Sequence, residues 1–242
     1  MFVDLHCHIL PCVDDGADSL NEACELILQA QKCGTTVMAA TPHYNNRNRC
    51  KRRLNKSYVK TAFYDLKEEV KRRGIDVSLY LGSELLATEN IERLNRDDEL
   101  ITLNNSRYIL VEFDFGEKKE FVIETIKKLF SYGLVPIIAH PERYDFLRNE
   151  PYIICDLLNY GCKVQINKGS PLGNYGEHAK KYSKWLLDND FVHVIASDCH
   201  SVSFRDADMQ GIYEWLLLNY PKDKIIKLMH GNPKKILMDS DI

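Results

Sequence analysis

Residues 2–8 read Phe-Val-Asp-Leu-His-Cys-His, an apolar strand pattern that ends in two histidines. The pattern returns along the chain, where short runs rich in β-branched residues alternate with longer stretches of helical periodicity. We expect strands at residues 2–6, 36–41, 78–83, 108–113, 134–139, 163–167 and 192–197.

Helices are expected between these strands. Ser19 and Glu22 have the spacing of a capping box, and they open a helix that ends before Gly34. Three further stretches also end before a glycine, namely 53–73, 118–132 and 151–160. The remaining helices are expected at about 177–189, around Trp215 and around Ile225.

This strand and helix alternation predicts parallel βαβ units with right-handed crossovers. No linker rich in Ser, Gly or Pro separates the units, so we expect one α/β domain over residues 1–242. A barrel would bring the carboxyl ends of all its strands to one mouth, whereas an open doubly wound sheet is the alternative.

Composition excludes several classes of protein. The 242 residues carry a formal net charge of -3 and are 28% charged, which argues against disorder and against a polyanion-coating surface. We found neither a run of about 20 apolar residues nor a signal peptide pattern, so we expect a cytoplasmic protein without membrane insertion. The 8 cysteines form no CxxC pair, and we interpret most of them as reduced core residues, including Cys24, Cys33, Cys155 and Cys162.

The residues that end the strands are mostly metal-ligand types. Only the expected strand 163–167 ends without an ionisable side chain, at Asn167. Neutral imidazoles and carboxylates are the groups that hold divalent cations, so their coincidence at the other strand ends predicts a metal site. The candidate ligands at strand ends are His6, His8, His43, Glu84, Glu112, His140, Asp198 and His200.

In order along the chain, the motifs Asp-Leu-His-Cys-His, Ala-Thr-Pro-His-Tyr, Gly-Ser-Glu, Val-Glu-Phe, Ala-His-Pro-Glu-Arg-Tyr and Ala-Ser-Asp-x-His resemble the polymerase and histidinol phosphatase (PHP) family. More narrowly, the chain resembles bacterial manganese-dependent protein-tyrosine phosphatases of capsule and exopolysaccharide regulation. The resemblance covers at least residues 1–205 and implies a distorted (β/α)7, TIM-like barrel.

The resemblance also implies three divalent metal ions, with Mn²⁺ preferred and iron or zinc as alternatives. The implied ligands are His6, His8, Glu84 and Asp198 for one ion, Asp14, His43 and His200 for a second, and Glu84, Glu112 and His140 for the third. Asp15 and Asp18 lie in the same loop as Asp14, so the identity of the loop ligand stays open.

Phosphate-ester hydrolysis needs a nucleophile at neutral pH and a clamp for the phosphoryl oxygens, and clustered divalent cations supply both. Two arginines, Arg143 and Arg205, follow strand ends, and a guanidinium fork suits phosphate oxygens. The resemblance implies that both bind substrate phosphate and that, with Asp198, they are catalytic, while a metal-bound hydroxide attacks phosphorus. Each arginine has a structural alternative: an ion pair of Arg143 with Glu142 or Asp145, and a solvated loop position for Arg205.

By resemblance, the substrate is a phosphotyrosine protein, the tail of a bacterial tyrosine kinase that drives polysaccharide export. Segment 47–73 holds eleven basic residues, which include Lys51, Arg52 and Arg53. The segment is either a solvated helix face or a basic surface that attracts an anionic protein tail. An oligomer is possible, and the sequence leaves the oligomeric state open.

Several alternatives compete with this interpretation. Cys199 to Arg205 has the C-x5-R spacing of cysteine-dependent tyrosine phosphatases, although the segment lacks the glycine that a phosphate loop needs. Cys7 is expected to pack on the opposite face from His6 and His8, whereas Cys12 could reach a metal. Other classes are a small-molecule phosphatase such as a histidinol phosphatase, a nuclease, an amidohydrolase and a non-catalytic regulator. No nucleic-acid partner is expected.

Overall fold

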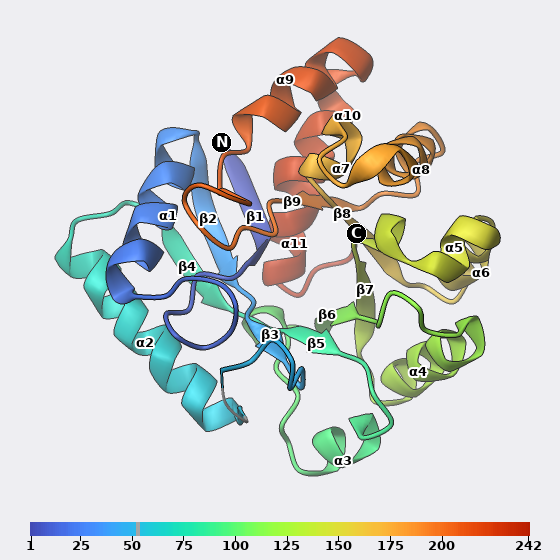
Figure 1. Cartoon of the computed structure of the whole chain (residues 1–242), viewed down its shortest axis with the longest axis horizontal. Coiled ribbons are helices and arrows are strands. Elements are labelled where there is room, and N and C mark those ends of the chain that lie inside the picture. The colour runs from blue at the N-terminus through green and yellow to red at the C-terminus, as the bar shows by residue number, and fades with distance from the viewer. Residues whose placement is uncertain (52–53) are drawn as a thin grey trace.

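The computed structural model describes residues 1–51 and 54–242, and it places strands in the middle of the molecule with helices around them (Figure 1). The strands are β1 (Phe2–Cys7), β2 (Thr35–Ala40), β3 (His43–Tyr44), β4 (Ser78–Leu81), β5 (Glu84–Leu86), β6 (Tyr108–Glu112), β7 (Val135–Ala139), β8 (Lys163–Asn167) and β9 (Val194–Ala196). The helices are α1 (Leu20–Lys32), α2 (Lys56–Arg72), α3 (Ile91–Arg96), α4 (Lys119–Ser131), α5 (Asp145–Asn149), α6 (Ile153–Asn159), α7 (Gly169–Leu172), α8 (Gly176–Asp188), α9 (Gln210–Asn219), α10 (Lys222–Ile226) and α11 (Asn232–Leu237), with short helical turns at Leu103–Asn105, Pro141–Arg143 and Lys227–Gly231.

Local sequence signals set the helix ends. At the start of α1, Ser19 Oγ accepts a hydrogen bond from Glu22 N, and the Glu22 carboxylate accepts one from Asp18 N. The helix stops at Gly34, whose φ of +91° is a conformation that glycine adopts without a steric penalty. The helices predicted before Gly74, Gly133 and Gly161 end in the same way, and those predictions are confirmed.

The protein is an α/β protein with parallel sheets. Among the described residues the strands form a three-stranded sheet, β1-β2-β4, and a six-stranded sheet, β3-β5-β6-β7-β8-β9, and their pairings are parallel. The two sheets meet beside β1, where Cys7 pairs with Cys199 in a parallel bridge. Backbone hydrogen bonds from Asp198 N to His6 O (2.8 Å) and from His8 N to Cys199 O (2.9 Å) join the same segments.

Two predicted strands are interrupted. The strand expected at 36–41 stops at Ala40, and the chain resumes as β3 after Pro42, which has no N–H to offer a neighbouring strand. The strand expected at 78–83 stops at Leu81 and resumes as β5 after Gly82, where a Cβ atom would lie 2.6 Å from Leu103 Cδ2. Both interruptions re-aim the chain directly before a candidate ligand.

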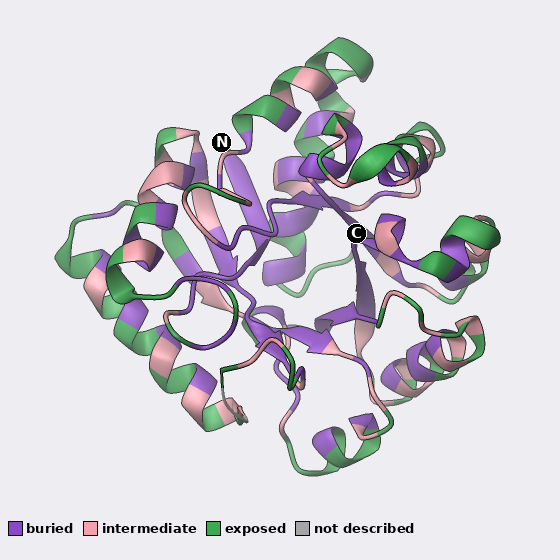
Figure 2. Ribbon diagram, in the orientation of Figure 1, coloured by how far each residue is buried: buried purple, intermediate pink, exposed green. Residues whose placement is uncertain are grey.

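The core lies between the strands and the inward faces of the helices, as Figure 2 shows by the buried strands and the exposed outer helix faces. Central strands are apolar along their length because both of their faces are covered. Leu110 on β6 and Ile138 on β7, for example, are each 1% exposed. In the described part of the chain we find no helix with the length and apolarity that crossing a membrane requires.

Candidate metal centre

The candidate ligands lie together, buried, at the carboxyl ends of the strands. His43 pairs directly with Glu84 across β3 and β5, so the two interrupted strands bring an imidazole and a carboxylate side by side. Three groups of side chains place potential ligand atoms within 4.8 Å of one another: His6, His8 and Asp198; His8, Asp15, His43 and His200; and His43, Glu84 and Glu112.

His6 and His8 present their Nε2 atoms to each other at 3.1 Å. His6 Nδ1 lies 2.9 Å from Gln165 Oε1, and His8 Nδ1 lies 2.7 Å from Asp14 Oδ2. Because these oxygens only accept hydrogen bonds, each Nδ1 carries the hydrogen and each neutral ring keeps a lone pair on Nε2. Asp198 Oδ1 lies 3.4 Å from His6 Nε2 and 3.3 Å from His8 Nε2. The arrangement needs a cation or a proton between the rings.

Glu84 lies at the centre of the cluster. Its Oε1 lies 3.3 Å from His6 Nε2 and 2.8 Å from His140 Nε2. Its Oε2 lies 3.4 Å from His8 Nε2 and 2.8 Å from His43 Nδ1. One carboxylate therefore touches histidines from both sides of the cluster, as a bridging ligand must.

The loop acids differ from the ligand set predicted with Asp14. Asp14 is fully buried, its Oδ2 accepts a hydrogen bond from His43 N (2.7 Å) and its Oδ1 accepts one from Gly16 N (3.0 Å). Asp15 Oδ1 instead lies 3.4 Å from His43 Nε2 and 3.5 Å from His200 Nε2. Asp15 therefore lies with the potential ligands, whereas Asp14 contacts His8 and the backbone of His43, and both acids stay candidates for the loop ligand.

A tight turn explains why two consecutive acids point in different directions. The chain folds back on itself at Gly16, where a Cβ atom would lie only 2.1 Å from His8 O. Only glycine permits this close approach of two backbone segments.

The third expected set, Glu84, Glu112 and His140, is also assembled. Glu112 Oε1 lies 3.7 Å from His140 Nε2, and Glu112 Oε2 lies 3.4 Å from His43 Nδ1. His43 thus stands between the second and third groups of potential ligands.

The electrostatics match a site built for cations. Burial by itself lowers the pKa of a histidine, but Glu84 and Asp198 raise the pKa of His6, and Glu84 raises the pKa of His43 to about 9. Burial opposes the charge of Glu84, yet His6 and His43 hold the pKa of that carboxyl well below its usual range. The raised pKa values of His6 and His43 show that the carboxylates favour positive charge at these positions.

Several buried atoms point into the cluster without a hydrogen-bond partner in the described part of the chain. They include Glu112 Oε2, Asp198 Oδ1 and His200 Nε2. A buried polar atom that forms no bond costs about 1–3 kcal/mol, and such atoms are uncommon in native interiors. Because each of these atoms is a metal-ligand type, bound divalent ions would satisfy them, and the residues fit the implied metals.

Sequence analysis missed two supporting residues on β8. Gln165 Nε2 donates to Asn167 Oδ1 (2.9 Å), and Asn167 Nδ2 donates to Asp198 Oδ2 (2.6 Å). With the contact from Gln165 to His6, this chain of amides fixes ligands on β1 and after β9. The available signal was two polar side chains two residues apart within an otherwise apolar strand, which therefore share one face.

Arg143 and Arg205 converge on the same carboxylate. Arg205 Nη2 contacts Asp198 Oδ2, and Arg143 Nη1 lies 3.8 Å from that oxygen. The Arg143 guanidinium lies between two rings, 4.5 Å from the centre of Phe115 and 5.1 Å from that of Tyr175. Both side chains are largely buried, at 18% and 15% exposed, so the solvated alternative for Arg205 does not hold.

The ion pair of Arg143 with Glu142 or Asp145 is also not formed among the described residues. Glu142 is buried and turned away, accepting hydrogen bonds from Asn167 N (2.9 Å) and Ser170 Oγ (2.6 Å). This leaves the Arg143 guanidinium facing the metal centre.

The cysteine alternatives fail on geometry. Cys199 is fully buried in the core, and the neighbouring His200 N donates to Arg205 O (2.8 Å) rather than facing a ligand. Cys7 is also fully buried, as predicted. Cys12 Sγ donates to Asp18 O (2.9 Å) and lies outside the three ligand groups.

Comparison with known proteins points to one family. The family model described as "Capsular polysaccharide synthesis, CpsB/CapC" matches residues 2–238. CapC of Staphylococcus aureus is 35% identical over 229 residues, covering 88% of this chain and 86% of that protein. The tyrosine-protein phosphatase CpsB of Streptococcus pneumoniae is 32% identical over 243 residues, with 98% of both chains covered.

Solved structures agree in fold. A structure from a study of YwqE from Bacillus subtilis and CpsB from Streptococcus pneumoniae, described as metal-dependent tyrosine phosphatases, superposes with a TM-score of 0.91 at 29% identity. It covers 99% of this chain and 96% of the other. A lactonase from Listeria monocytogenes, at 9% identity and a TM-score of 0.63 over 99% of this chain and 95% of the other, shares the fold alone. Motif order, buried ligand clusters and full-length similarity together show that the chain belongs to the CpsB/CapC family of capsular polysaccharide synthesis.

Proposed function

We propose that this protein is a metal-dependent protein-tyrosine phosphatase that acts in the regulation of capsular or exopolysaccharide synthesis. The observation that carries the proposal is the convergence of three groups of buried ligand side chains with two arginines at Asp198. The relatives named tyrosine-protein phosphatases, similar along nearly the whole chain, support the same activity.

Three divalent ions, Mn²⁺ in preference to iron or zinc, would be held by this cluster. In this proposal His6, His8, Glu84 and Asp198 hold the first ion, Asp15, His43 and His200 the second, and Glu84, Glu112 and His140 the third. The short distances among these side chains support it. When bound, such ions lower the pKa of water so that a nucleophile exists at neutral pH, and they neutralise phosphoryl charge.

The chain's own residues bind and orient the phosphoryl group. Arg143 and Arg205 would take its outer oxygens, because a guanidinium donates through a planar fork. Asp198 holds the two guanidinium groups on one side of the ligand cluster, which fixes the direction from which the phosphate is presented. The phenol of tyrosine has a pKa of about 10, so a strong general acid is not required for the phenolate to leave.

The fold proposal is a distorted (β/α)7 barrel that forms a single domain over residues 1–242. In this proposal β2 with β3, and β4 with β5, are interrupted single strands that pass between the two sheets. The Cys7 to Cys199 bridge supports closure on the other side.

The proposed substrate is the phosphotyrosine tail of a bacterial tyrosine kinase, met in the cytoplasm, and an oligomer is compatible with this role. The basic segment 47–73 would attract such an anionic tail, although its Arg52 and Arg53 lie outside the described residues.

The test is a substrate panel with purified protein, stripped of metal and then supplied with Mn²⁺. A phosphotyrosine peptide, a phosphoserine peptide, histidinol phosphate, single-stranded DNA and a nucleotide are compared by phosphate or product release. We expect metal-dependent hydrolysis of the phosphotyrosine peptide with the highest kcat/KM. Higher kcat/KM on histidinol phosphate or cleavage of DNA would assign the site to another phosphoesterase, and activity that survives EDTA would overturn the metal requirement.

A further inference from the structure

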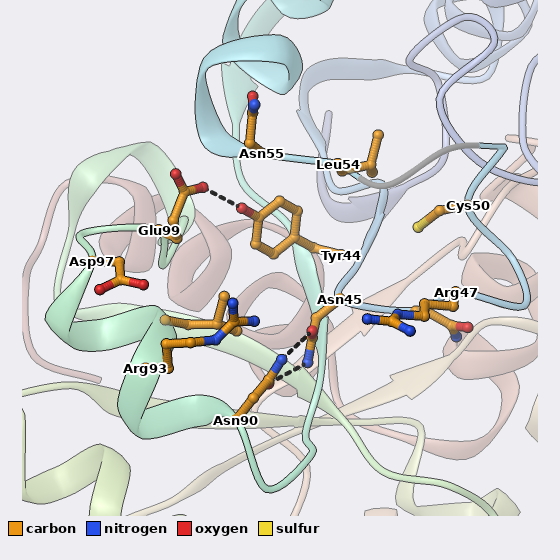
Figure 3. A pocket seen from close by; sticks show the side chains of 12 residues that line it. Tyr44, Asn45, Arg47, Cys50, Leu54, Asn55, Asn90, Arg93, Asp97 and Glu99 are labelled. Carbon is orange, nitrogen blue, oxygen red and sulfur yellow. Dashed lines mark hydrogen bonds between the residues drawn. The ribbon is translucent and has the colours of Figure 1, made fainter.

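A polar cavity of about 350 Å³ lies beside the metal centre, outside the ligand groups described above. Figure 3 shows its lining side chains, which include Tyr44, Asn45, Arg47, Asn90 and Arg93. They come from β3, the segment that follows it, and α3, which approach from different parts of the chain.

The cavity shares a wall with the metal centre. His43 and Tyr44 are consecutive on β3, so their side chains leave on opposite faces. His43 reaches the ligand cluster, and Tyr44 lines the cavity. Cys50, another lining residue, donates through Sγ to His43 O (3.2 Å), and this contact holds the segment after β3 against the strand. The cavity and the ligand cluster are therefore neighbours on the two faces of β3.

Two arginines line the cavity without a partner. Arg47 and Arg93 enter from opposite sides of the cavity (Figure 3), and neither guanidinium group forms a hydrogen bond, an ion pair or a ring contact with residues 1–51 or 54–242. By contrast, Arg49 lies 3.4 Å from Asp15, and Arg96 lies 3.5 Å from Asp97. The guanidinium groups of Arg47 and Arg93 are thus available to a ligand.

The acidic residues of the lining do not cancel this charge. Glu99 Oε2 accepts hydrogen bonds from Tyr44 Oη (2.7 Å) and Lys56 N (2.7 Å), which are neutral donors, so Glu99 keeps its negative charge. Asp97 is paired with Arg96 on the surface. The two unpaired guanidinium groups of Arg47 and Arg93 therefore outnumber the one carboxylate without a cationic partner, and the charge of the lining is positive on balance.

The floor of the cavity is rigid. Asn45 has a φ of +64° and donates through Nδ2 to Leu86 O (3.0 Å) and to Asn90 Oδ1 (3.0 Å). Asn90 Nδ2 donates back to Asn45 Oδ1 (3.0 Å). This reciprocal amide pair, drawn in Figure 3, holds the loop after β3 against the segment before α3 and keeps the cavity open.

We infer that this cavity binds an anionic group, a carboxylate or a phosphate, on the substrate polypeptide next to the phosphotyrosine that is hydrolysed. The inference rests on the proposed function and adds a sequence preference to it. Arginine pairs match both anions because the guanidinium donors are coplanar. Flanking residues lie about 3.3–3.6 Å apart along an extended peptide, so a group one to a few residues away reaches a neighbouring cavity.

The experiment uses the Mn²⁺-loaded enzyme and three peptides that differ only beside the phosphotyrosine, with neutral, aspartate or second-phosphotyrosine flanks. The readout is kcat/KM for each peptide divided by kcat/KM for a small aryl phosphate, which has no flanking residue. In the wild type we expect this ratio to be about 5- to 10-fold higher for the anionic peptides than for the neutral one, because two partly exposed charge pairs contribute together. The aspartate and phosphotyrosine arms identify which anion the cavity prefers.

Variants decide the role of the cavity. Arg47→Glu combined with Arg93→Glu should invert the preference, so that a lysine-flanked peptide becomes better than an aspartate-flanked one. Lys222→Glu combined with Lys235→Glu is the matched control, because it makes the same change in net charge at exposed positions of α10 and α11, outside the cavity, and should leave the peptide ratio of the wild type. Equal ratios in the wild type and the double variant would overturn the inference, whereas loss of aryl phosphate hydrolysis in every protein would overturn the proposed function instead.

Discussion

The two adjacent loop acids should behave in opposite ways when each is changed. Asp14 is fully buried and accepts hydrogen bonds from His8 Nδ1, His43 N and Gly16 N. Removing one partner of a buried charged pair costs about 3–5 kcal/mol, because the other partner is left without compensation. We therefore expect Asp14→Ala to lower the free energy of unfolding by about 3–5 kcal/mol.

Asp15 should contribute little to stability and much to metal binding. Its side chain is 42% exposed and lies 3.4 Å from Arg49 Nη1, a surface contact worth about 0.2–1 kcal/mol. Its Oδ1 is nevertheless placed between His43 Nε2 and His200 Nε2. We expect Asp15→Asn to keep the stability of the metal-free protein within about 1 kcal/mol and to lose one of the bound ions, since a carboxylate ligand is removed.

Two measurements separate these effects. Urea denaturation of chelator-treated protein gives the free energy of unfolding, and elemental analysis with Mn²⁺ titration calorimetry gives the number of ions and their affinities. Asp18→Asn is the control, because Asp18 lies in the same loop with its side chain 80% exposed. If Asp14→Ala lost an ion without losing stability while Asp15→Asn bound the full complement, the assignment of the loop ligand would be refuted.

Three further predictions follow from the same contacts. Gln165→Leu should weaken binding of the ion near His6 by about 10- to 100-fold, because the hydrogen bond that orients the ring is lost, and Mn²⁺ titration measures this. Cys199→Ser should retain phosphatase activity that EDTA abolishes, so an inactive Cys199→Ser protein of normal stability would contradict the metal mechanism. Burial, reinforced by Lys163, lowers the pKa of His193 to about 4, so only the unfolded chain takes up this proton between about pH 6.5 and 4, and stability falls as the pH falls through that window. From pH 7 to 5 this loss is about 2 kcal/mol, and the free energies of unfolding of wild type and His193→Gln, measured by urea denaturation at both pH values, should differ in their pH dependence by that amount.

Most strands and helices could be predicted because their signals are local. Buried parallel strands are continuous apolar runs, and the helices end at glycines with positive φ, as at Gly34. The short strands β3 and β5 escaped prediction because two or three residues have no readable period. Their positions depend on contacts made elsewhere, such as the close approach of Gly82 to Leu103.

The sequence predicts the charged residues of the site but not the uncharged ones. Histidines and acids at strand ends stand out in the sequence, but the choice between Asp14 and Asp15 depends on the backbone turn at Gly16. Gln165 and Asn167 were missed because an uncharged amide in a strand has no chemistry of its own. Their role arises only when the sheet pairs β8 with β9 and the Gln165 side chain reaches His6 on β1.

Asp198 links the two halves of the site. Its Oδ1 faces Nε2 of His6, while its Oδ2 accepts from Asn167 and contacts Arg205. The residue has a φ of +55°, a conformation that aspartate tolerates better than most side chains and that turns the chain directly after β9. Because one carboxylate contacts the potential ligands with one oxygen and the arginines with the other, the position of the proposed phosphate clamp is fixed relative to the potential ligands. A neutral or longer residue at this position would uncouple the clamp from the ligand cluster even if both survived separately.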